Sequence, residues 1–190
     1  MTVAAHEDTR ARIRQVALEL FAARGFEKTS LREIADRLGV TKAALYYHFP
    51  SKDALLESQV APLLDEVDAL LDDGEALRAG VPRQREFLER YLDLLLGHRA
   101  LIGWLVNDVA VLAHPAVGLR ARAQAQRIQA LLGGDAVDLA ERVRVTAALG
   151  ALNSGVANFP GTPSDDLRAP LLAAARAVLG LRAGGRRSGG

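Results

Sequence analysis

The sequence predicts an all-α fold of about nine helices, in which a small three-helix head is followed by a larger helical body. Three observations favour this fold class. Apolar residues recur at intervals of three and four rather than alternating as they do in strands. Capping residues and breaks that contain Gly or Pro separate these runs. Hydrophobic residues make up 49% of the 190 residues and aromatic residues only 5%, which suits helices packed on helices.

The first helix is expected from about Thr9 to Arg24. Five of its apolar residues have the spacing of one buried helix face. They are Ile13, Val16, Ala17, Leu20 and Phe21. Gly25 ends the helix, because glycine adopts the left-handed conformation after a helix without a Cβ penalty. Phe26 can then fold back as the apolar contact that accompanies such a stop.

The second and third helices are short and joined by a tight turn. Ser30 and Glu33 have the spacing of a capping box, so a helix is expected over 31–38. Thr41 caps the third helix, expected over 42–49, and a glycine between the two helices permits a sharp turn. Two amphipathic helices joined in this way have the plan of a helix-turn-helix.

A long fourth helix is expected from Lys52, capped by Ser51, to about Leu71. The Asp-Asp-Gly sequence at 72–74 predicts a break. Further breaks divide the remaining chain into five helices, over 82–97, 100–113, 116–132, 136–159 and 165–180. The expected organisation is a head over 1–52, a helical body over 53–180 and a flexible tail over 181–190.

Composition and spacing argue against several classes of protein. The chain has no cysteine, which excludes disulfides, thiolate metal sites and a cysteine nucleophile. No apolar run reaches the ~18 residues that span a bilayer, and the N-terminus lacks the pattern of a signal peptide. We therefore expect a cytoplasmic protein with no membrane partner. Candidate catalytic pairs such as Asp108 with His114 lack a nucleophile elbow or metal-ligand spacing, so no enzyme, cofactor or metal site is expected.

The opening of the third helix carries the strongest functional signal. In a helix-turn-helix, the N-terminal residues of the second motif helix face base edges in the DNA major groove. Ala43 and Ala44 would let the backbone approach the groove floor and contact thymine methyl groups. Lys42 would bond guanine or pair with a phosphate.

Ring and basic side chains flank this opening. The polar tips of Tyr46, Tyr47 and His48 suit phosphate oxygens along the groove walls. Lys52 lies at the start of a helix, where a cation opposes the helix dipole, so an external anion would explain it. Taken singly, each residue also suits ordinary packing or a solvated surface. Their assembly within about 25 residues of a helix-turn-helix favours DNA binding.

Four runs carry a family resemblance. They are LELFAARGFEKTS at 18–30, LREIA at 31–35, GVTK at 39–42 and LYYHFPSK at 45–52. Together they make residues 8–60 similar to the DNA-binding domain of TetR-family (TetR/AcrR-type) transcriptional regulators. Many members have Gly where this chain has Ala43, which bears on how closely the helix approaches the groove.

The resemblance implies base or phosphate contacts from a set of residues in the head, with Thr29 on a backbone phosphate. The complete set of expected DNA-binding residues is Thr29, Ser30, Arg32, Thr41, Lys42, Ala43, Ala44, Tyr46, Tyr47, His48 and Lys52.

Dimerisation is one expected role of the body, because two half-sites multiply the selectivity of a single recognition helix. The last two helices are the candidates, since similar family members pair through a four-helix bundle. The expected interface residues are Ala147, Ala151, Ser154, Leu171, Leu172, Ala175, Val178 and Leu179. The alternative is that these residues form the core of the single chain.

Ligand sensing is the second expected role, because polar groups lie among apolar helices in the middle of the body. The candidate ligand-binding residues are Phe87, Tyr91, Trp104, Asn107, Asp108 and His114. Alternatively, Trp104 is a core residue and His114 a loop residue. A pocket poor in charge favours a hydrophobic or aromatic effector.

The sequence thus predicts a ligand-responsive repressor that binds a palindromic double-stranded DNA operator as a homodimer. A small-molecule effector would release it, through a swing of the fourth helix that changes the separation of the two reading heads. Two alternatives share the same head, a transcriptional activator and a DNA-binding protein that senses no ligand.

Overall fold

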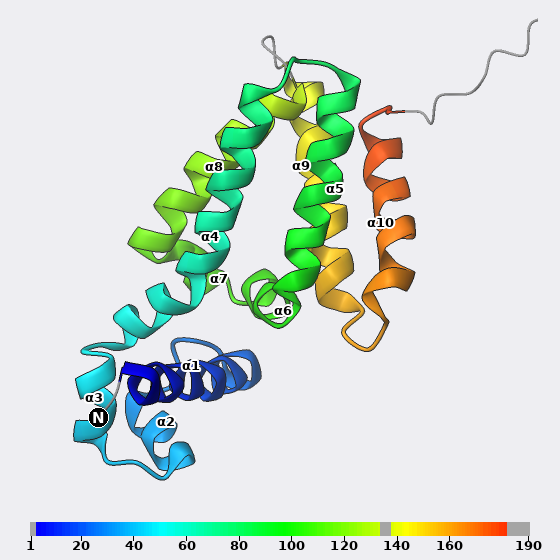
Figure 1. Cartoon of the computed structure of the whole chain (residues 1–190). Coiled ribbons are helices and arrows are strands. Elements are labelled where there is room, and N and C mark those ends of the chain that lie inside the picture. Colours follow the sequence, from blue (N-terminus) through cyan, green and yellow to red (C-terminus); the bar gives the residue numbers. More distant parts are fainter. Residues whose placement is uncertain (1–2, 134–137, 182–190) are drawn as a thin grey trace, which may run out of the picture.

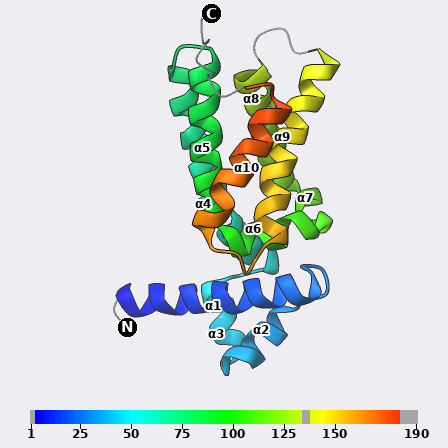
Figure 2. The ribbon, with the colours of Figure 1, turned by 90° about the vertical axis from the view of Figure 1, so that its right-hand side faces the viewer.

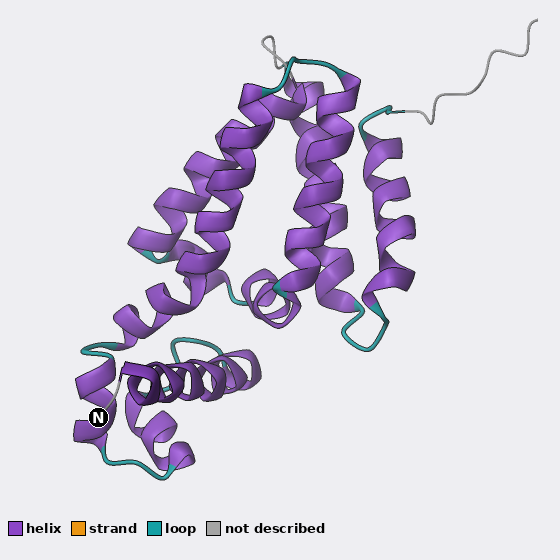
Figure 3. Cartoon of the chain, in the orientation of Figure 1, coloured by secondary structure: helices purple, strands orange, loops and turns teal. Residues whose placement is uncertain are grey.

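The computed structural model describes residues 3–133 and 138–181. Within these ranges the chain forms ten helices and no strand, as Figure 1 and Figure 3 show. They are α1 (Val3–Arg24), α2 (Leu31–Leu38), α3 (Lys42–His48), α4 (Lys52–Ala76), α5 (Val81–Gly97), α6 (Arg99–Asn107), α7 (Val109–Ala113), α8 (Pro115–Gly133), α9 (Leu139–Asn158) and α10 (Ser164–Val178). The all-α fold class is confirmed.

The head and the body are joined by α4 and by α6. Helices α2 and α3 lie on the side of α1 that faces away from the body (Figures 1 and 2). Helix α4 leaves the head and runs up the body beside α8, and α6 lies across the base of the body next to α1. Buried apolar residues of the head and the body belong to one continuous core. The head is therefore packed against the body rather than tethered to it.

The predicted break after residue 71 is wrong, because α4 continues to Ala76. Gly74 is buried against α8, and a Cβ at this position would lie 2.6 Å from Leu131 Cδ1. The glycine thus serves close helix packing rather than a turn. Sequence alone could not distinguish the two uses, since the neighbour that excludes a side chain comes from a distant helix.

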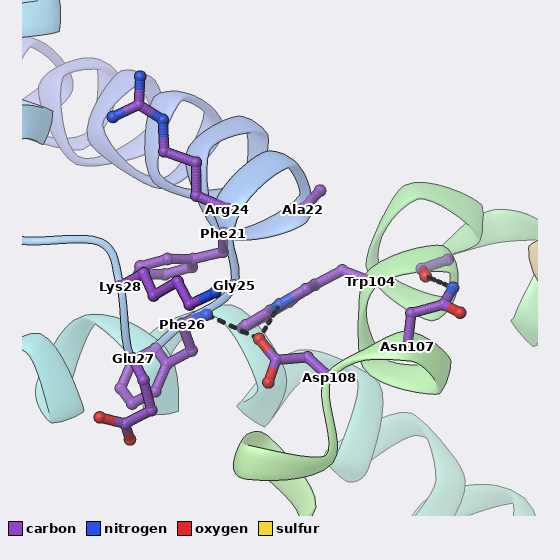
Figure 4. A pocket seen from close by; sticks show the side chains of 11 residues that line it. Phe21, Ala22, Arg24, Gly25, Phe26, Glu27, Lys28, Trp104, Asn107 and Asp108 are labelled. Carbon is purple, nitrogen blue, oxygen red and sulfur yellow. Dashed lines mark hydrogen bonds between the residues drawn. The ribbon is translucent and has the colours of Figure 1, made fainter.

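The single helix predicted over 100–113 is also wrong, because the chain leaves helical geometry at Asp108, with φ −114° and ψ 86°. Helix α6 ends there and α7 follows. The Asp108 side chain is turned toward the head instead of along the helix (Figure 4).

At the C-terminal end, Leu181 is buried, although it is the first residue of the predicted tail. Residues 182–190 of that tail lie outside the described residues, as do residues 136 and 137 at the predicted start of α9. None of the described helices combines the length and the hydropathy needed to cross a membrane.

Ion pairs join α4 to α8 along both helices. Arg120 bonds Asp65 and Asp68, with its closest approach to each at 2.6 Å. Arg127 bonds Asp72 at 2.6 Å and Glu75 at 2.8 Å. We call these six residues the α4–α8 charge ladder. Because the acids are one helical turn apart on α4, the ladder fixes the register of the two helices.

The charge ladder makes stability dependent on pH. Burial alone would raise the pKa of Asp68, but hydrogen bonds from Gln124 and Arg120 outweigh it and hold the pKa below its usual value. The hydrogen bond from Arg127 likewise lowers the pKa of Glu75. A carboxylate whose pKa is lower in the folded state stabilises the fold above its unfolded pKa, about 4, and loses this effect as the pH falls through the folded pKa.

We therefore expect the free energy of unfolding to decrease as the pH is lowered from about 5 to about 3. Arg127→Met should lower it by about 1 kcal/mol at pH 7, since half-exposed ion pairs are individually weak. The variant should also show a shallower dependence on pH, because the pKa of Glu75 returns toward its usual value. Urea unfolding at a series of pH values measures both effects. The matched control is Arg122→Met, an exposed arginine of α8 outside the ladder, and equal pH slopes in the two variants would contradict this account.

Candidate nucleic-acid interface and effector cavity

Helix α3 is exposed along the face that was expected to read DNA. Lys42, Ala43 and Ala44 at its start are exposed, and Tyr46 and Tyr47 are 41% and 73% exposed. The helix is held by Leu45 and by Phe49 directly after it, both at most 1% exposed. In Figure 1, α3 lies in the head, on the side of α1 away from the body, and the side chains of residues 42–44, 46 and 47 are left exposed by the described residues.

Local sequence fixes both ends of the turn before α3. Gly39 is left-handed, with φ 69°, and its N–H bonds Ala35 O and Asp36 O at the end of α2. The Thr41 hydroxyl accepts the Ala44 N–H at 3.1 Å and caps α3. Because the cap fixes the first turn, the small side chains at its start are held in one orientation.

Helix α3 is also tied to α1. Arg10 donates a hydrogen bond of 2.7 Å to His48 O, and its guanidinium lies 4.4 Å from the centre of the Phe49 ring. Sequence reasoning missed Arg10, since no motif marks a single arginine on a helix that is distant in sequence. The contact anchors the C-terminal end of the reading helix.

Electrostatics at the exposed face favour an anion. The ammonium group of Lys42 lies 5.4 Å from the centre of the Tyr46 ring, one helical turn along the same face. The tyrosine ring thus steadies the cation while both remain exposed to solvent. A cation, hydroxyl tips and two alanines on one short helix could together contact a phosphate backbone and the floor of a groove.

The capping box predicted at the start of α2 is confirmed. The Ser30 hydroxyl accepts the Glu33 N–H at 3.2 Å, and the Glu33 carboxylate accepts the Ser30 N–H at 2.8 Å. This bond from the Ser30 backbone, with that from its side chain, lowers the pKa of Glu33. Arg32 is 81% exposed and lies 3.8 Å from Asp36, so its guanidinium remains available to a phosphate.

The structure does not support the phosphate contact predicted for Thr29. Its side chain is only 2% exposed, and its hydroxyl donates to Gly25 O at 2.9 Å. Threonine at this position closes the turn between α1 and α2. His48 is also buried, at 7% exposed, so the predicted contact of its ring with DNA is not supported either.

Lys52 has an acceptor within its own chain. Its ammonium donates to Phe26 O at 3.0 Å and Glu27 O at 3.2 Å, and it lies 4.3 Å from the centre of the Phe26 ring. These contacts remove the reason for expecting an external anion at the start of α4. Lys52 instead ties α4 to the turn after α1.

A cavity of about 320 Å³ lies inside the body and is lined by residues from α4 to α9. Among the described residues that line it, none carries a formal charge. Twelve are aliphatic, and the polar ones are Tyr91, Gln124 and Asn153. Burial raises the pKa of Tyr91, so its hydroxyl stays protonated at neutral pH. The cavity thus offers an apolar volume with a few uncharged hydrogen-bonding groups.

The predicted ligand residues divide between two places. Tyr91 lines the cavity, and the ring of Phe87 stacks on it at 5.8 Å. Trp104 is buried against the head instead, with its ring stacked 5.1 Å from that of Phe21. Asp108 bonds the head, and the ring of His114 lies 6.4 Å from that of Phe26.

Asn107 also lies outside the body cavity, and its amide donates to Gly103 O in its own helix at 2.8 Å. Trp104, Asn107 and Asp108 instead line a second pocket, between the head and α6, and His114 lines neither pocket, so their contact with an effector stays a prediction. Sequence reasoning missed Gln124 and Asn153, since a single amide on an amphipathic helix gives no signal of its own.

The predicted dimer residues also divide. Leu172 and Ala175 are buried in the core of their own chain, and Leu171 packs on Gly155 between α10 and α9. These three residues therefore belong to the core of the single chain, which was the alternative to a dimer interface. Ala147 and Ser154 are exposed on α9, Ala151 and Leu179 are half-buried, and Val178 on α10 is 37% exposed.

Comparisons with known proteins agree with this geometry. Residues 13–58 match the family described as bacterial regulatory proteins, tetR family. The chain is 36% identical over 58 residues to the HTH-type transcriptional repressor KstR2 of Rhodococcus jostii, a match that covers 30% of this chain and 28% of that protein. It is 36% identical over 94 residues to the HTH-type transcriptional activator FasR of Mycolicibacterium smegmatis, which covers 44% and 42%. These matches thus span less than half of the curated relatives.

The whole fold is similar to that of the ketosteroid transcriptional regulator KstR2 of Mycobacterium tuberculosis. The TM-score is 0.72 at 22% sequence identity, over 90% of this chain and 93% of that one. At 22% sequence identity, this similarity shows a shared fold and nothing about ligand or function.

The described residues thus combine a capped helix-turn-helix with a larger helical body. Residues 13–58 match the tetR family of bacterial regulatory proteins, and the chain as a whole has a fold similar to that of KstR2.

Proposed function

We propose that this chain is a cytoplasmic, ligand-responsive transcriptional repressor that binds a palindromic operator as a homodimer. A small, uncharged, apolar effector that enters the body cavity would release the operator. The observation that carries the proposal is the exposed first turn of α3. It presents Lys42, Ala43 and Ala44 to solvent on a helix that Leu45 and Arg10 hold in place.

DNA reading by this turn follows from the size of its side chains. The two alanines add little bulk, so the helix backbone can approach the floor of the major groove. Lys42 then reaches a base edge or a phosphate, and Tyr47, 73% exposed, reaches the groove wall. Thr41, Arg32 and Ser30 lie on the flanks as further phosphate ligands.

Pairing of two chains through α9 and α10 is supported by apolar side chains that their own chain leaves exposed. On α9, Val143, Ala147, Gly150 and Ser154 lie at intervals of three and four and form one exposed face. Val143 is 58% exposed. Small residues permit close approach of two helices, and a two-fold axis would place each face against its copy.

An uncharged effector is supported by the chemistry of the cavity. A charged ligand would lose its hydration without gaining an opposite charge, which is costly in an apolar site. An apolar ligand with one polar group could instead bond Tyr91, Asn153 or Gln124. The relatives include a named repressor and a named activator. The first alternative to test is therefore that the chain activates transcription instead of repressing it.

Selection of bound duplexes from fragments of genomic DNA, followed by binding titrations, tests the proposed function. The wild-type chain should enrich a palindromic sequence. Lys42→Ala should weaken binding and, if it contacts a base, relax the preference at one position at a cost of ~1–3 kcal/mol. Arg122→Ala, an equal loss of charge on α8, is the matched control and should bind like the wild type. Wild-type protein that prefers no duplex over random DNA at low salt would contradict the proposal.

A further inference from the structure

The contact between the head and α6 depends on one carboxylate. Asp108 Oδ2 accepts the backbone N–H of Phe26 at 2.7 Å, and the same oxygen accepts the Trp104 Nε1–H at 2.9 Å. Phe26 lies in the turn after α1, whereas Trp104 lies on α6 (Figure 4). The two donors come from two parts of the chain, so this side chain adds a bond between the head and the body to the contacts of α4 and of the Trp104 ring.

The surrounding residues leave this carboxylate little freedom. The turn that presents the Phe26 N–H begins with Gly25, whose φ of 86° is left-handed. A Cβ on Gly25 would lie 3.7 Å from Asp108 Oδ2. Trp104 is 3% exposed, and its ring stacks on Phe21 of the head at an angle of 24°. The stacking of Trp104 on Phe21 thus orients the indole N–H that Asp108 accepts.

Hydrogen bonds to a carboxylate are shorter and stronger than bonds between neutral groups. After a left-handed glycine, this N–H often bonds a carbonyl of the preceding helix. In this chain the Phe26 N–H donates to Asp108 Oδ2. Loss of Asp108 would leave two donors without an acceptor at a partly buried junction. Such a loss is costly because each donor has already given up water.

We infer that Asp108 is a positioning residue that fixes the angle of the head on the body and so determines which half-site separation the dimer accepts. The inference rests on the proposed binding of a palindromic operator. In a dimer, each reading helix is placed by its own head, and the heads are placed by α4 and by this contact with α6. A rigid head accepts one separation, about one turn of DNA, whereas a loosened head accepts several.

Asp108 lies directly after α6, which adds a connection to the cavity. Ile102, Leu105 and Val106 line the cavity from α6, whereas Trp104 on the opposite face of that helix and Asp108 at its end contact the head. These two faces are about one helix diameter, ~10 Å, apart. A ligand that displaces α6 would therefore carry the head contact with it.

The first test reads the junction directly and needs no DNA. Trp104 is the one tryptophan of the chain, so its fluorescence reports this site alone. In Asp108→Ala and Asp108→Leu, we expect Trp104 emission to shift to longer wavelength and the Phe26 amide to exchange with solvent about tenfold faster or more. Glu86→Gln, an exposed acid of α5 at the other end of the body, is the control and should match the wild type. Asp108 variants that match the wild type in both measurements would overturn the inference.

The second test measures how well the protein tolerates a change in the spacing of the two operator half-sites. A merely structural role of Asp108 would not change this tolerance. Operators with one or two additional central base pairs rotate the half-sites by about 35° for each pair. The wild type should bind them much more weakly than the natural operator. For Asp108→Leu, which is similar in size and has no acceptor oxygen, the ratio of the two affinities should decrease about tenfold, and circular dichroism checks that it is folded.

An unchanged ratio in folded Asp108→Leu would overturn the inference. Wild-type protein that binds no duplex would instead contradict the proposed function, and the fluorescence and exchange measurements would still decide whether Asp108 holds the head.

Discussion

Ala43→Glu is expected to abolish specific binding to DNA while leaving the fold intact. Ala43 is exposed in the first turn of α3, so a larger side chain meets nothing in its own chain. In the groove it would add bulk between the helix and the bases and place a negative charge near phosphates. Like charges at an interface cost several kcal/mol, so we expect the affinity for the operator to decrease by at least about a hundredfold.

Fluorescence anisotropy with a labelled operator measures this loss. Ala130→Glu is the matched control, because it makes the same change at an exposed position of α8 in the body. It should bind within about twofold of the wild type at moderate salt, where distant charges are screened. Ala43→Gly should bind at least as well as the wild type. If Ala43→Glu binds like Ala130→Glu, α3 does not enter the groove.

Gly150→Arg should convert the proposed dimer into a monomer. A Cβ at Gly150 meets no atom of its own chain within 4 Å, so the chain alone tolerates a side chain there. On the exposed face of α9, however, a two-fold axis would bring two arginines together at the centre of the interface. An unpaired buried charge costs ~3–5 kcal/mol, which would raise the dissociation constant of the dimer by more than about a hundredfold.

Sedimentation velocity at micromolar concentrations measures the change in mass, and operator affinity should decrease with it because only one half-site is held. Ala130→Arg, on α8, supplies the control for added positive charge. A Gly150→Arg protein that remains dimeric would remove α9 from the interface and leave the remaining exposed face, on α10, as the candidate.

Local features of the sequence predicted the head well. The capping box of Ser30 and Glu33, the left-handed Gly39 and the cap at Thr41 each depend on residues within a few positions of one another. Such signals are complete within one short segment, so the sequence contains all that is needed to interpret them.

Contacts between distant segments were not predictable in the same way. Lys52 and Thr29 have side chains that suit a phosphate, yet backbone carbonyls in the turn after α1 bind both. Trp104 and Asp108 resembled ligand groups because they are polar or aromatic residues in an apolar helix, whereas the structure places them against the head. In each case, the partner that decides the role lies far away in the sequence.

The cavity and the dimer face show the same limit. Tyr91 was identified, but Gln124 and Asn153 line the cavity from two further helices. The small residues of α9 suit an interface or a core equally well until the packing of α10 is known. Gly155 faces α10, whereas Gly150, five residues earlier, faces solvent.

Chemical protection of the selected operator by dimethyl sulfate tests the central claim most directly, because the reagent methylates guanine N7 in the major groove and adenine N3 in the minor groove. If the first turn of α3 reads DNA in a dimer, bound protein should protect guanine N7 in two inverted half-sites about one helical turn apart, ~34–36 Å. Protection of adenine N3 alone, or of a single site without a symmetric copy, would contradict this account.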